Sequence, residues 1–341
     1  MKNNRLSVIN EAQESIGFSG TTLIKSAEEL PVISSRDFAN RAERLANRTG
    51  TRFGIASGCK LFTSIAICQL VEEGRISFDN KLTECIDYRF SGFSETITIH
   101  HLLTHTSGVP DYFDEEVMDD FEDLWKTVPM YTIHKLEDFL PFFQNEQMKF
   151  TPGQQFQYNN TGYILLGLIV EKISGLQFTD YVEKYIFKKA GMIDSGYFTF
   201  DNLPINTAHG YIDFEDGTWK TNIYSLPVKG GSDGGAYITV EDMVLFWEAF
   251  LMHELVNEFF TNKILTPHVK NEDDSFYGYG IWIKKTKGII SKYHIMGYDP
   301  GVSFHSAYYP LSNTILVVCS NASTGAFDVM KVVEKTIIDN L

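Results

Sequence analysis

The sequence has few cysteines, a shortage of positive charge and no long apolar run, and each of these shortages excludes a class of protein. Its four cysteines, at positions 59, 68, 85 and 319, form no CxxC pair, so we expect free thiols in the core rather than a disulfide framework or a zinc site. Basic residues number 29 against 44 acidic residues, which gives a net charge of -15. That charge opposes extended contact with nucleic acid phosphates, and nucleic acid is therefore not an expected partner.

No apolar stretch is long enough to cross a bilayer, and the amino-terminal residues carry no secretion signal. A membrane helix needs about 20 predominantly apolar residues in a row, and a signal peptide needs an apolar run of roughly 7 to 15 residues. The opening segment contains neither: it reads MKNNRLSVINEAQESIGFSG. We therefore expect a protein without a membrane span that is cytoplasmic, or extracellular if a signal peptide has been removed.

The two ends of the chain carry the pattern of strands, whereas the middle carries the pattern of helices. Residues 5–16 predict a helix, which is followed by short strands in GFSGTTLI and LPVISS. Apolar residues at helical spacing occur in ITIHHLLTH, HKLEDFLPFFQ, NTGYILLGLIVEKISG, FTDYVEKYIFKKAG and TVEDMVLFWEAFLMHE. The last quarter predicts antiparallel strands in YGYGIWIKK, GIISKYHIM, GVSFHSAYYP and NTILVVCSN, and a closing helix in AFDVMKVVEKTIIDNL.

This order predicts an α+β fold in which both termini contribute to one antiparallel sheet flanked by helices, with a mainly helical lobe inserted between them. We expect a single domain over residues 1–341. An α/β lobe would take in approximately residues 1–56 and 255–341, and a helical lobe approximately residues 57–254.

A lysine opens the most apolar helix of the chain. Lys60 precedes LFTSIAICQLV, whose apolar residues cover almost every direction around a helix, so this helix is expected to be buried. An unpaired buried ammonium is costly. Ser57 lies three residues earlier, on the same helix face, and the positive end of the helix dipole would lower the pKa of the lysine. A neutral Lys60 could then take the Ser57 proton during nucleophilic attack; a serine cap followed by a surface lysine is the structural alternative.

Two further patterns suggest other chemistries, and their contexts argue against both. GGSDG, at 230–234, matches the GxSxG nucleophile elbow with Ser232 as nucleophile, but it lacks the buried strand before it and the helix after it that the elbow requires. His101 and His105 are spaced like two metal ligands on a helix, yet Leu102 stands at the position of the catalytic glutamate and no third ligand is evident. We expect structural histidines and no metal site.

Several segments together resemble one superfamily. FGIASGCKLFTSIAI resembles the active-site segment of the serine β-lactamase, penicillin-binding protein and esterase superfamily, and ITIHHLLTHTSGVPDY is similar to a stretch of its class C β-lactamase-like branch. FTPGQQFQYNNTGYILLGLIVEKISG and GGAYITVEDMVLFWEAFL extend the resemblance over most of residues 17–321. The resemblance implies a β-lactamase/transpeptidase-like fold, catalysis through an acyl-enzyme, and neither a metal nor an organic cofactor.

Carried over residue by residue, the resemblance places the nucleophile at Ser57, its lysine at Lys60, and the tyrosine and asparagine of a YxN motif at Tyr158 and Asn160. A tyrosine beside the lysine can relay a proton to the leaving group or activate water, and an asparagine can orient the lysine and bind a substrate carbonyl. From the residues alone, Asn159 or Asn160 could instead cap the next helix. Both roles can hold at once.

The third motif of the superfamily departs from the pattern. The family has Lys or His, any residue and then Gly on a strand beside the site, and KYHIMGYDPGVSF aligns Gly297 with that glycine but Ile295 with the basic position. His294 comes one residue early and, like Lys292, faces away unless a bulge turns it into the site to bind substrate. The backbone N–H of Tyr298 is a candidate second donor to the oxyanion.

The sequence therefore predicts a serine hydrolase that acts through an acyl-enzyme on small esters, amides or D-amino-acid peptides. The resemblance implies that the base of the third motif binds a substrate carboxylate. Because Ile295 stands at that position, neutral esters should be preferred. The alternative is a catalytically weakened penicillin-binding or sensor protein that acylates but does not turn over. The oligomeric state stays open.

Overall fold

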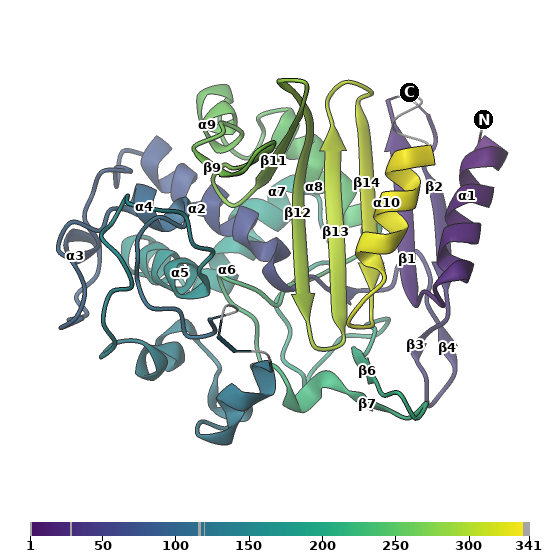
Figure 1. Ribbon diagram of the computed structural model, residues 1–341, viewed down its shortest axis with the longest axis horizontal. Coiled ribbons are helices and arrows are strands. Elements are labelled where there is room, and N and C mark those ends of the chain that lie inside the picture. Colours follow the sequence, from purple (N-terminus) through teal and green to yellow (C-terminus); the bar gives the residue numbers. More distant parts are fainter. Residues whose placement is uncertain (1, 28, 115–116, 119, 337–341) are drawn as a thin grey trace.

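The computed structural model contains an eight-stranded antiparallel sheet (Figure 1). The structure describes residues 2–27, 29–114, 117–118 and 120–336. The first two strands lie at one edge of this sheet, beside the last strand, as predicted. In spatial order the strands are β2 (Val32–Arg36), β1 (Gly20–Ser26), β14 (Thr314–Ser320), β13 (Val302–Tyr309), β12 (Ile289–Asp299), β11 (Trp282–Thr286), β10 (Ser275–Tyr277) and β9 (Val269–Glu272).

Both faces of this sheet are covered, which explains why the central strand β14 is apolar at most of its positions. All seven residues of β14 are buried. Leu23 and Val317 belong to the main core, whereas Ile24 and Leu316 belong to a second core on the opposite face. A sheet that is buried on both faces reads as a continuous apolar run rather than as an alternation of apolar and polar residues.

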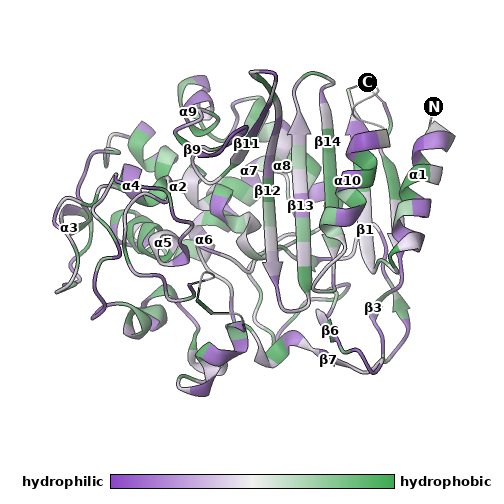
Figure 2. Ribbon diagram, in the orientation of Figure 1, coloured by the Kyte–Doolittle hydropathy of each residue, from purple (hydrophilic) through white to green (hydrophobic). Residues whose placement is uncertain are grey.

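The terminal helices α1 (Lys2–Ser15) and α10 (Ala326–Thr336) cover one face, and α8 (Val240–Leu251) covers the other (Figure 1). Figure 2 shows hydrophobic and hydrophilic turns alternating along α1 and α10, as expected for helices with one buried side. Helix α8 contacts β1 and β14, and Trp247 Nε1 donates to Ser306 Oγ at 2.8 Å. The predicted boundary near residue 254 had put α8 in the helical lobe, but its apolar side packs on the sheet. The last five residues of the predicted closing helix lie outside the described residues.

The inserted lobe is built around α2 (Lys60–Glu72), which is buried from its first residue to Leu70. Helix α5 (Asn160–Ser174) packs against it and ends at Gly175, whose φ of +75° suits a glycine C-cap. The other helical segments of the chain are η1 (Ala56–Cys59), α3 (Leu82–Cys85), α4 (Ile99–Leu103), η2 (Phe121–Lys126), η3 (Met130–Thr132), η4 (Leu136–Phe142), α6 (Phe178–Val182), η5 (Glu183–Phe187), α7 (Lys188–Ala190), η6 (Asn222–Tyr224) and α9 (Glu258–Ile264).

Two of the predicted helices are shorter or tighter than expected. HKLEDFLPFFQ forms the 3₁₀ helix η4, which contains Pro141, a residue that disfavours a continuous α-helix. ITIHHLLTH forms only the five residues of α4, because the chain turns at His105 with a φ of +57°. Among the described residues no helix is long and apolar enough to cross a membrane.

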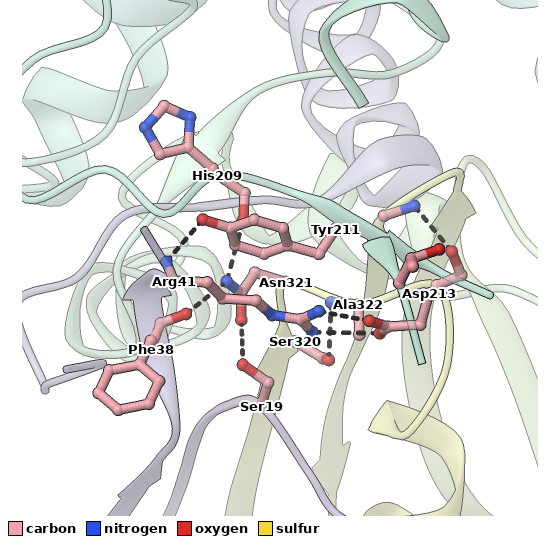
Figure 3. Close-up of polar contacts among 12 residues, drawn as sticks. Ser19, Phe38, Arg41, His209, Tyr211, Asp213, Ser320, Asn321 and Ala322 are labelled. Atoms are coloured by element: carbon pink, nitrogen blue, oxygen red, sulfur yellow. Dashed lines mark hydrogen bonds and ion pairs between the residues drawn. The ribbon is translucent and has the colours of Figure 1, made fainter. Parts of the chain in front are cut away.

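The buried amide of Asn321 joins segments that are far apart in the sequence (Figure 3). Its Nδ2 donates to the carbonyl oxygens of Phe38 at 3.0 Å and His209 at 2.9 Å, and its Oδ1 accepts from Ser19 Oγ at 2.7 Å. Beside it, Arg41 forms an ion pair with Asp213 on the hairpin of β6 (Tyr211–Asp213) and β7 (Trp219–Thr221). Two other small sheets pair β3 (Phe38–Asn40) with β4 (Leu45–Ala46) and β5 (Phe53–Gly54) with β8 (Tyr237–Ile238).

The partly buried His294 of β12 and the buried His305 of β13 stack on the face covered by α10. The rings of His294 and His305 are 5.1 Å apart, and neither nitrogen of His305 has a hydrogen-bond partner among the described residues. Lys292, on the same face, donates to Glu334 of α10 at 2.6 Å. Burial, together with the charge of Lys292, holds the pKa of His305 well below 6.5.

We expect His305→Phe to reduce the acid sensitivity of folding. Below about pH 6.5 the unfolded chain takes up a proton on this histidine while the folded chain does not. Falling pH therefore costs about 1.4 kcal/mol of unfolding free energy per pH unit at such a group, until the folded-state pKa is reached. Urea unfolding between pH 7.5 and pH 4.5 should give a shallower pH slope for the variant than for the parent. An identical slope would show that His305 is already protonated in the folded state.

Candidate active site

The predicted nucleophile and its lysine are in contact. Ser57 lies in η1, which continues directly into α2, and Lys60 Nζ donates to Ser57 Oγ at 2.9 Å. Lys60 is only 2% exposed, whereas Ser57 is partly exposed. The lysine is thus buried and paired, and the structural alternative of a surface lysine after a serine cap is wrong.

The Lys60 ammonium has three acceptors in addition to the Tyr158 side chain. Besides Ser57 Oγ, Nζ donates to Asn160 Oδ1 at 2.8 Å and to the backbone oxygen of Asp233 at 2.8 Å. Burial lowers the pKa of Lys60, but the charges of Tyr158, Asp233 and Asp111 and a hydrogen bond with Tyr158 outweigh it, so the pKa is raised. This direction favours a charged Lys60 and does not support the predicted neutral base.

The two asparagines of the YNN segment make different contacts. Asn159 caps α5, where its Oδ1 accepts from the Gly162 nitrogen at 2.7 Å. Asn160, the first residue of α5, contacts Lys60. Tyr158 precedes them, and its ring centroid lies 4.9 Å from Lys60 Nζ. The tyrosine and the asparagine of the predicted motif thus meet the predicted lysine.

Asp111 is a member of this site that the sequence analysis missed. Its carboxylate accepts from the backbone nitrogens of Asn160 at 2.8 Å and Thr161 at 3.0 Å, and so it holds the first turn of α5. Burial raises the pKa of Asp111 to about 7, although these hydrogen bonds and Lys60 oppose the shift. Its partners are 49 and 50 positions away in the chain, so no local pattern points to them.

The glycine of the third motif lies directly against the nucleophile segment. A methyl group on Gly297 would come within 2.1 Å of the Ile55 oxygen and 2.7 Å of the Ser57 nitrogen, so only glycine fits there. Ile295, two residues earlier on the same strand face, is 2% exposed and packs in the main core. An apolar side chain therefore occupies the position where the superfamily has a base.

His294 is not part of the site, and its prediction as a substrate-binding residue is wrong. The pairing of β12 with β13 runs without a shift from Tyr293 to Asp299, so no bulge turns the strand. His294 opposes Ala307, which belongs to the core under α10, and its ring stacks on His305. The side chain therefore faces away from Ser57, as strand alternation requires.

A cavity of 340 Å³ opens beside Ser57, between the end of β12 and the helical lobe. Its polar lining includes Ser57, Asn160, Asp233 and Tyr298. Most of its remaining wall is apolar, and the aromatic residues that line it are Tyr112, Phe113, Phe121, Phe139, Phe198, Phe200 and Tyr237. Such a cavity can take a small ligand with an apolar body and place it against a serine.

The competing nucleophile and metal hypotheses find no support in the geometry. Ser232 is fully buried, does not line the cavity, and lies in a loop rather than at a strand-to-helix turn. His105 accepts from the Asn159 nitrogen at 3.1 Å and packs on Tyr158, while His101 closes the capping box at the start of α4. Within the described ranges, no group of three or more potential ligands could hold a metal ion. All four cysteines are buried free thiols, as predicted.

The site and the fold together define a serine hydrolase of the β-lactamase/transpeptidase-like fold. The family model described as Beta-lactamase matches residues 19–333, and the chain belongs to this family. A crystal structure of a penicillin binding protein from Bacillus halodurans is 63% identical, with a TM-score of 0.93 over 96% of this chain and 99% of that chain. Penicillin-binding protein 4* of Bacillus subtilis (strain 168) is 29% identical over 94% of this chain and 73% of its own length.

A more distant structure shares the fold alone. The D-amino acid amidase from Ochrobactrum anthropi SV3, complexed with D-phenylalanine, is 20% identical and has a TM-score of 0.82, over 100% of this chain and 99% of that chain.

We expect Asp111→Asn to lower kcat about tenfold at pH 8 and to have a smaller effect at pH 6. The parent carboxylate is ionised at pH 8 and accepts both backbone N–H groups, whereas an amide offers one acceptor, so Asn160 shifts. At pH 6 the parent carboxyl is itself largely protonated, because its pKa is about 7. Ester turnover measured across this range, with the surface variant Asp87→Asn as control, tests the idea. An equal loss at both pH values would show a purely structural role.

Proposed function

We propose that this serine hydrolase cleaves small neutral esters and amides through an acyl-enzyme on Ser57. The observation that carries the proposal is the contact of Ser57 Oγ with a buried Lys60 at the edge of a mainly apolar cavity. A serine hydroxyl becomes an effective nucleophile when a neighbouring group can accept its proton. The cavity gives the acyl group of the substrate an apolar environment next to that oxygen.

In this proposal Tyr158 is the base and Lys60 is its electrostatic partner. A charged Lys60 cannot accept a proton, but it favours negative charge on the neighbouring phenol oxygen, and the two groups interact. Tyr158 takes the proton of Ser57 Oγ while that oxygen attacks the substrate carbonyl carbon. The proton then passes to the leaving alcohol or amine, and the acyl group stays on Ser57.

Deacylation repeats these steps with water as the nucleophile. Tyr158 removes a proton from the water, which attacks the acyl carbonyl, and Ser57 regains its proton as the acid departs. In both steps the backbone N–H groups of Ser57 and of Tyr298, which lies on β12, are proposed to stabilise the oxyanion. The close approach of Gly297 to the Ser57 nitrogen supports this role, because it brings the β12 backbone next to the nucleophile. Asn160 holds Lys60 and is proposed to bind the substrate carbonyl or amide.

A noncatalytic penicillin-binding or sensor role is the second candidate. It is favoured by the 63% identity to a protein titled as a penicillin binding protein, and by the loss of the third-motif base at Ile295. An acyl trap would form the Ser57 ester and fail to release it. Incubation with p-nitrophenyl butyrate and with a fluorescent penicillin separates the two: repeated release means turnover, and a single stoichiometric label means a trap.

Ser57→Ala should abolish ester turnover and covalent labelling, and Ser232→Ala should leave both intact. Ser57 Oγ is the hydroxyl in contact with Lys60, whereas Ser232 is buried away from the cavity. Intact mass after treatment with a fluorophosphonate probe checks both variants. An adduct that survives in Ser57→Ala and disappears in Ser232→Ala would sink the assignment.

Ile295→Lys should shift specificity toward substrates that carry a carboxylate. The parent offers an apolar side chain at this position, and an unpaired buried carboxylate costs roughly 2 to 5 kcal/mol, so neutral esters should be its better substrates. Values of kcat/KM for p-nitrophenyl butyrate, nitrocefin and a D-alanyl-D-alanine peptide measure this. His294→Ala is the matched control, because its ring lies on the far face of the sheet and should change none of the three ratios. A parent that already prefers the carboxylate substrates contradicts the proposal.

A further inference from the structure

A second cavity, of 370 Å³, lies behind one wall of the catalytic cavity. Its lining comes from two stretches of chain, residues 39–51 and 200–209. Phe200 lines both cavities, so it is a shared wall between them. The serine, lysine and tyrosine of the catalytic site do not line the second cavity.

The chemistry of this lining is unusual for so acidic a chain. Acidic residues outnumber basic residues 44 to 29 in the sequence. Among the described residues, however, no carboxylate lines the cavity, whereas Arg48 and His209 do. Nearby arginines are engaged: Arg41 pairs with Asp213, and Arg52 pairs with Asp194. Within the part of the chain that the structure describes, the Arg48 guanidinium makes no ion pair and no hydrogen bond; only its backbone is bonded.

Two more side chains in the lining carry hydrogen-bond donors without an acceptor among the described residues. The carbonyl of His209 is held by Asn321, and Figure 3 shows the imidazole pointing away from that polar network. No interaction of the His209 ring with the described residues is recorded, and one ring nitrogen of a histidine always carries a hydrogen to donate. The Oδ1 of Asn40 accepts from the Glu43 nitrogen at 3.0 Å, which leaves its amide N–H bonds available.

The walls of the cavity are fixed by backbone hydrogen bonds across its two stretches. The His209 nitrogen donates to the Ala39 oxygen at 2.9 Å, and Asn321 Nδ2 donates to the carbonyls of both Phe38 and His209. Arg52, just beyond the first stretch, donates from its nitrogen to the Asn206 oxygen at 2.8 Å. A cavity held in this way needs little reorganisation to bind a ligand.

We propose that this second cavity binds a small anion that carries a carboxylate or a phosphate group. Arg48 supplies the charge and a planar pair of donors that matches two oxygens of either group. His209 and Asn40 supply further N–H donors. The absence of a carboxylate in the lining removes the repulsion that an anion would meet elsewhere on a chain with a net charge of -15.

Because Phe200 is common to both cavities, an anion in the second cavity restricts the ring that also borders the acyl group. Bound anion should therefore change KM for p-nitrophenyl butyrate. This coupling rests on the proposed esterase function, whereas anion binding itself does not.

Isothermal titration with inorganic phosphate and, separately, with acetate tests binding without reference to catalysis. The parent should bind at least one of them saturably, and the tighter of the two identifies the phosphate or the carboxylate source. Arg48→Gln and His209→Gln should each weaken that binding at least about fivefold, in line with the loss of a charge-assisted hydrogen bond.

Arg44→Gln is the matched control, because it removes the same charge from the same loop but lies outside the lining, over the ring of Phe38. Its affinity should stay within about twofold of the parent, a difference of less than 0.5 kcal/mol. The proposal is overturned if neither anion binds the parent saturably, or if Arg44→Gln weakens binding as much as Arg48→Gln. If binding behaves as expected and esterase activity is absent, only the proposed function fails.

Discussion

The structure around the catalytic serine depends on the burial of one ammonium group. Lys60 is removed from water almost completely, and a buried charge is tolerated only when its donors are satisfied and opposite charge is near. Three of its acceptors come from η1, the start of α5 and the loop before β8. Backbone hydrogen bonds join η1 to that loop, whereas Asn160 reaches Lys60 from a separate segment. The requirement to solvate Lys60 thus fixes where the nucleophile, the YxN segment and the cavity wall meet.

The same requirement explains which parts of the site could be predicted from the sequence. Ser57 and Lys60 are three residues apart, and the apolar residues after Lys60 show that it is buried, so their contact follows from local geometry. The sheet was predictable for a similar reason, because its strands are apolar and are bounded by turns. The backbone oxygen of Asp233 and the carboxylate of Asp111 were not predictable, because their roles arise only when distant segments pack together. The direction of the Lys60 pKa shift depends on the same distant groups.

The third motif shows how strand geometry limits substitution near a catalytic site. Side chains alternate across β12, so a base one position early at His294 ends in the other core, beside Lys292 and His305. Gly297 lies against the backbone oxygen of Ile55 and the backbone nitrogen of Ser57, so this contact needs a glycine at 297 but no particular side chain at 55 or 57. The close backbone approach of this strand to Ser57 is therefore kept, while the apolar Ile295 stands two residues before Gly297 on the same face.

The pairing of β1 with β14 has a consequence for how the protein is made. Gly20 of β1 lies opposite Ser320 of β14, so β1 can form this pairing only after about 300 further residues have been synthesised. At roughly 5 to 20 residues per second, this delay is about 15 to 60 seconds. During that time the side of β1 that later pairs with β14 is an unpaired strand edge, which is a template for intermolecular strand pairing. Nascent-chain solubility, rather than the stability of the finished fold, is therefore expected to limit the yield of this protein at high expression rates.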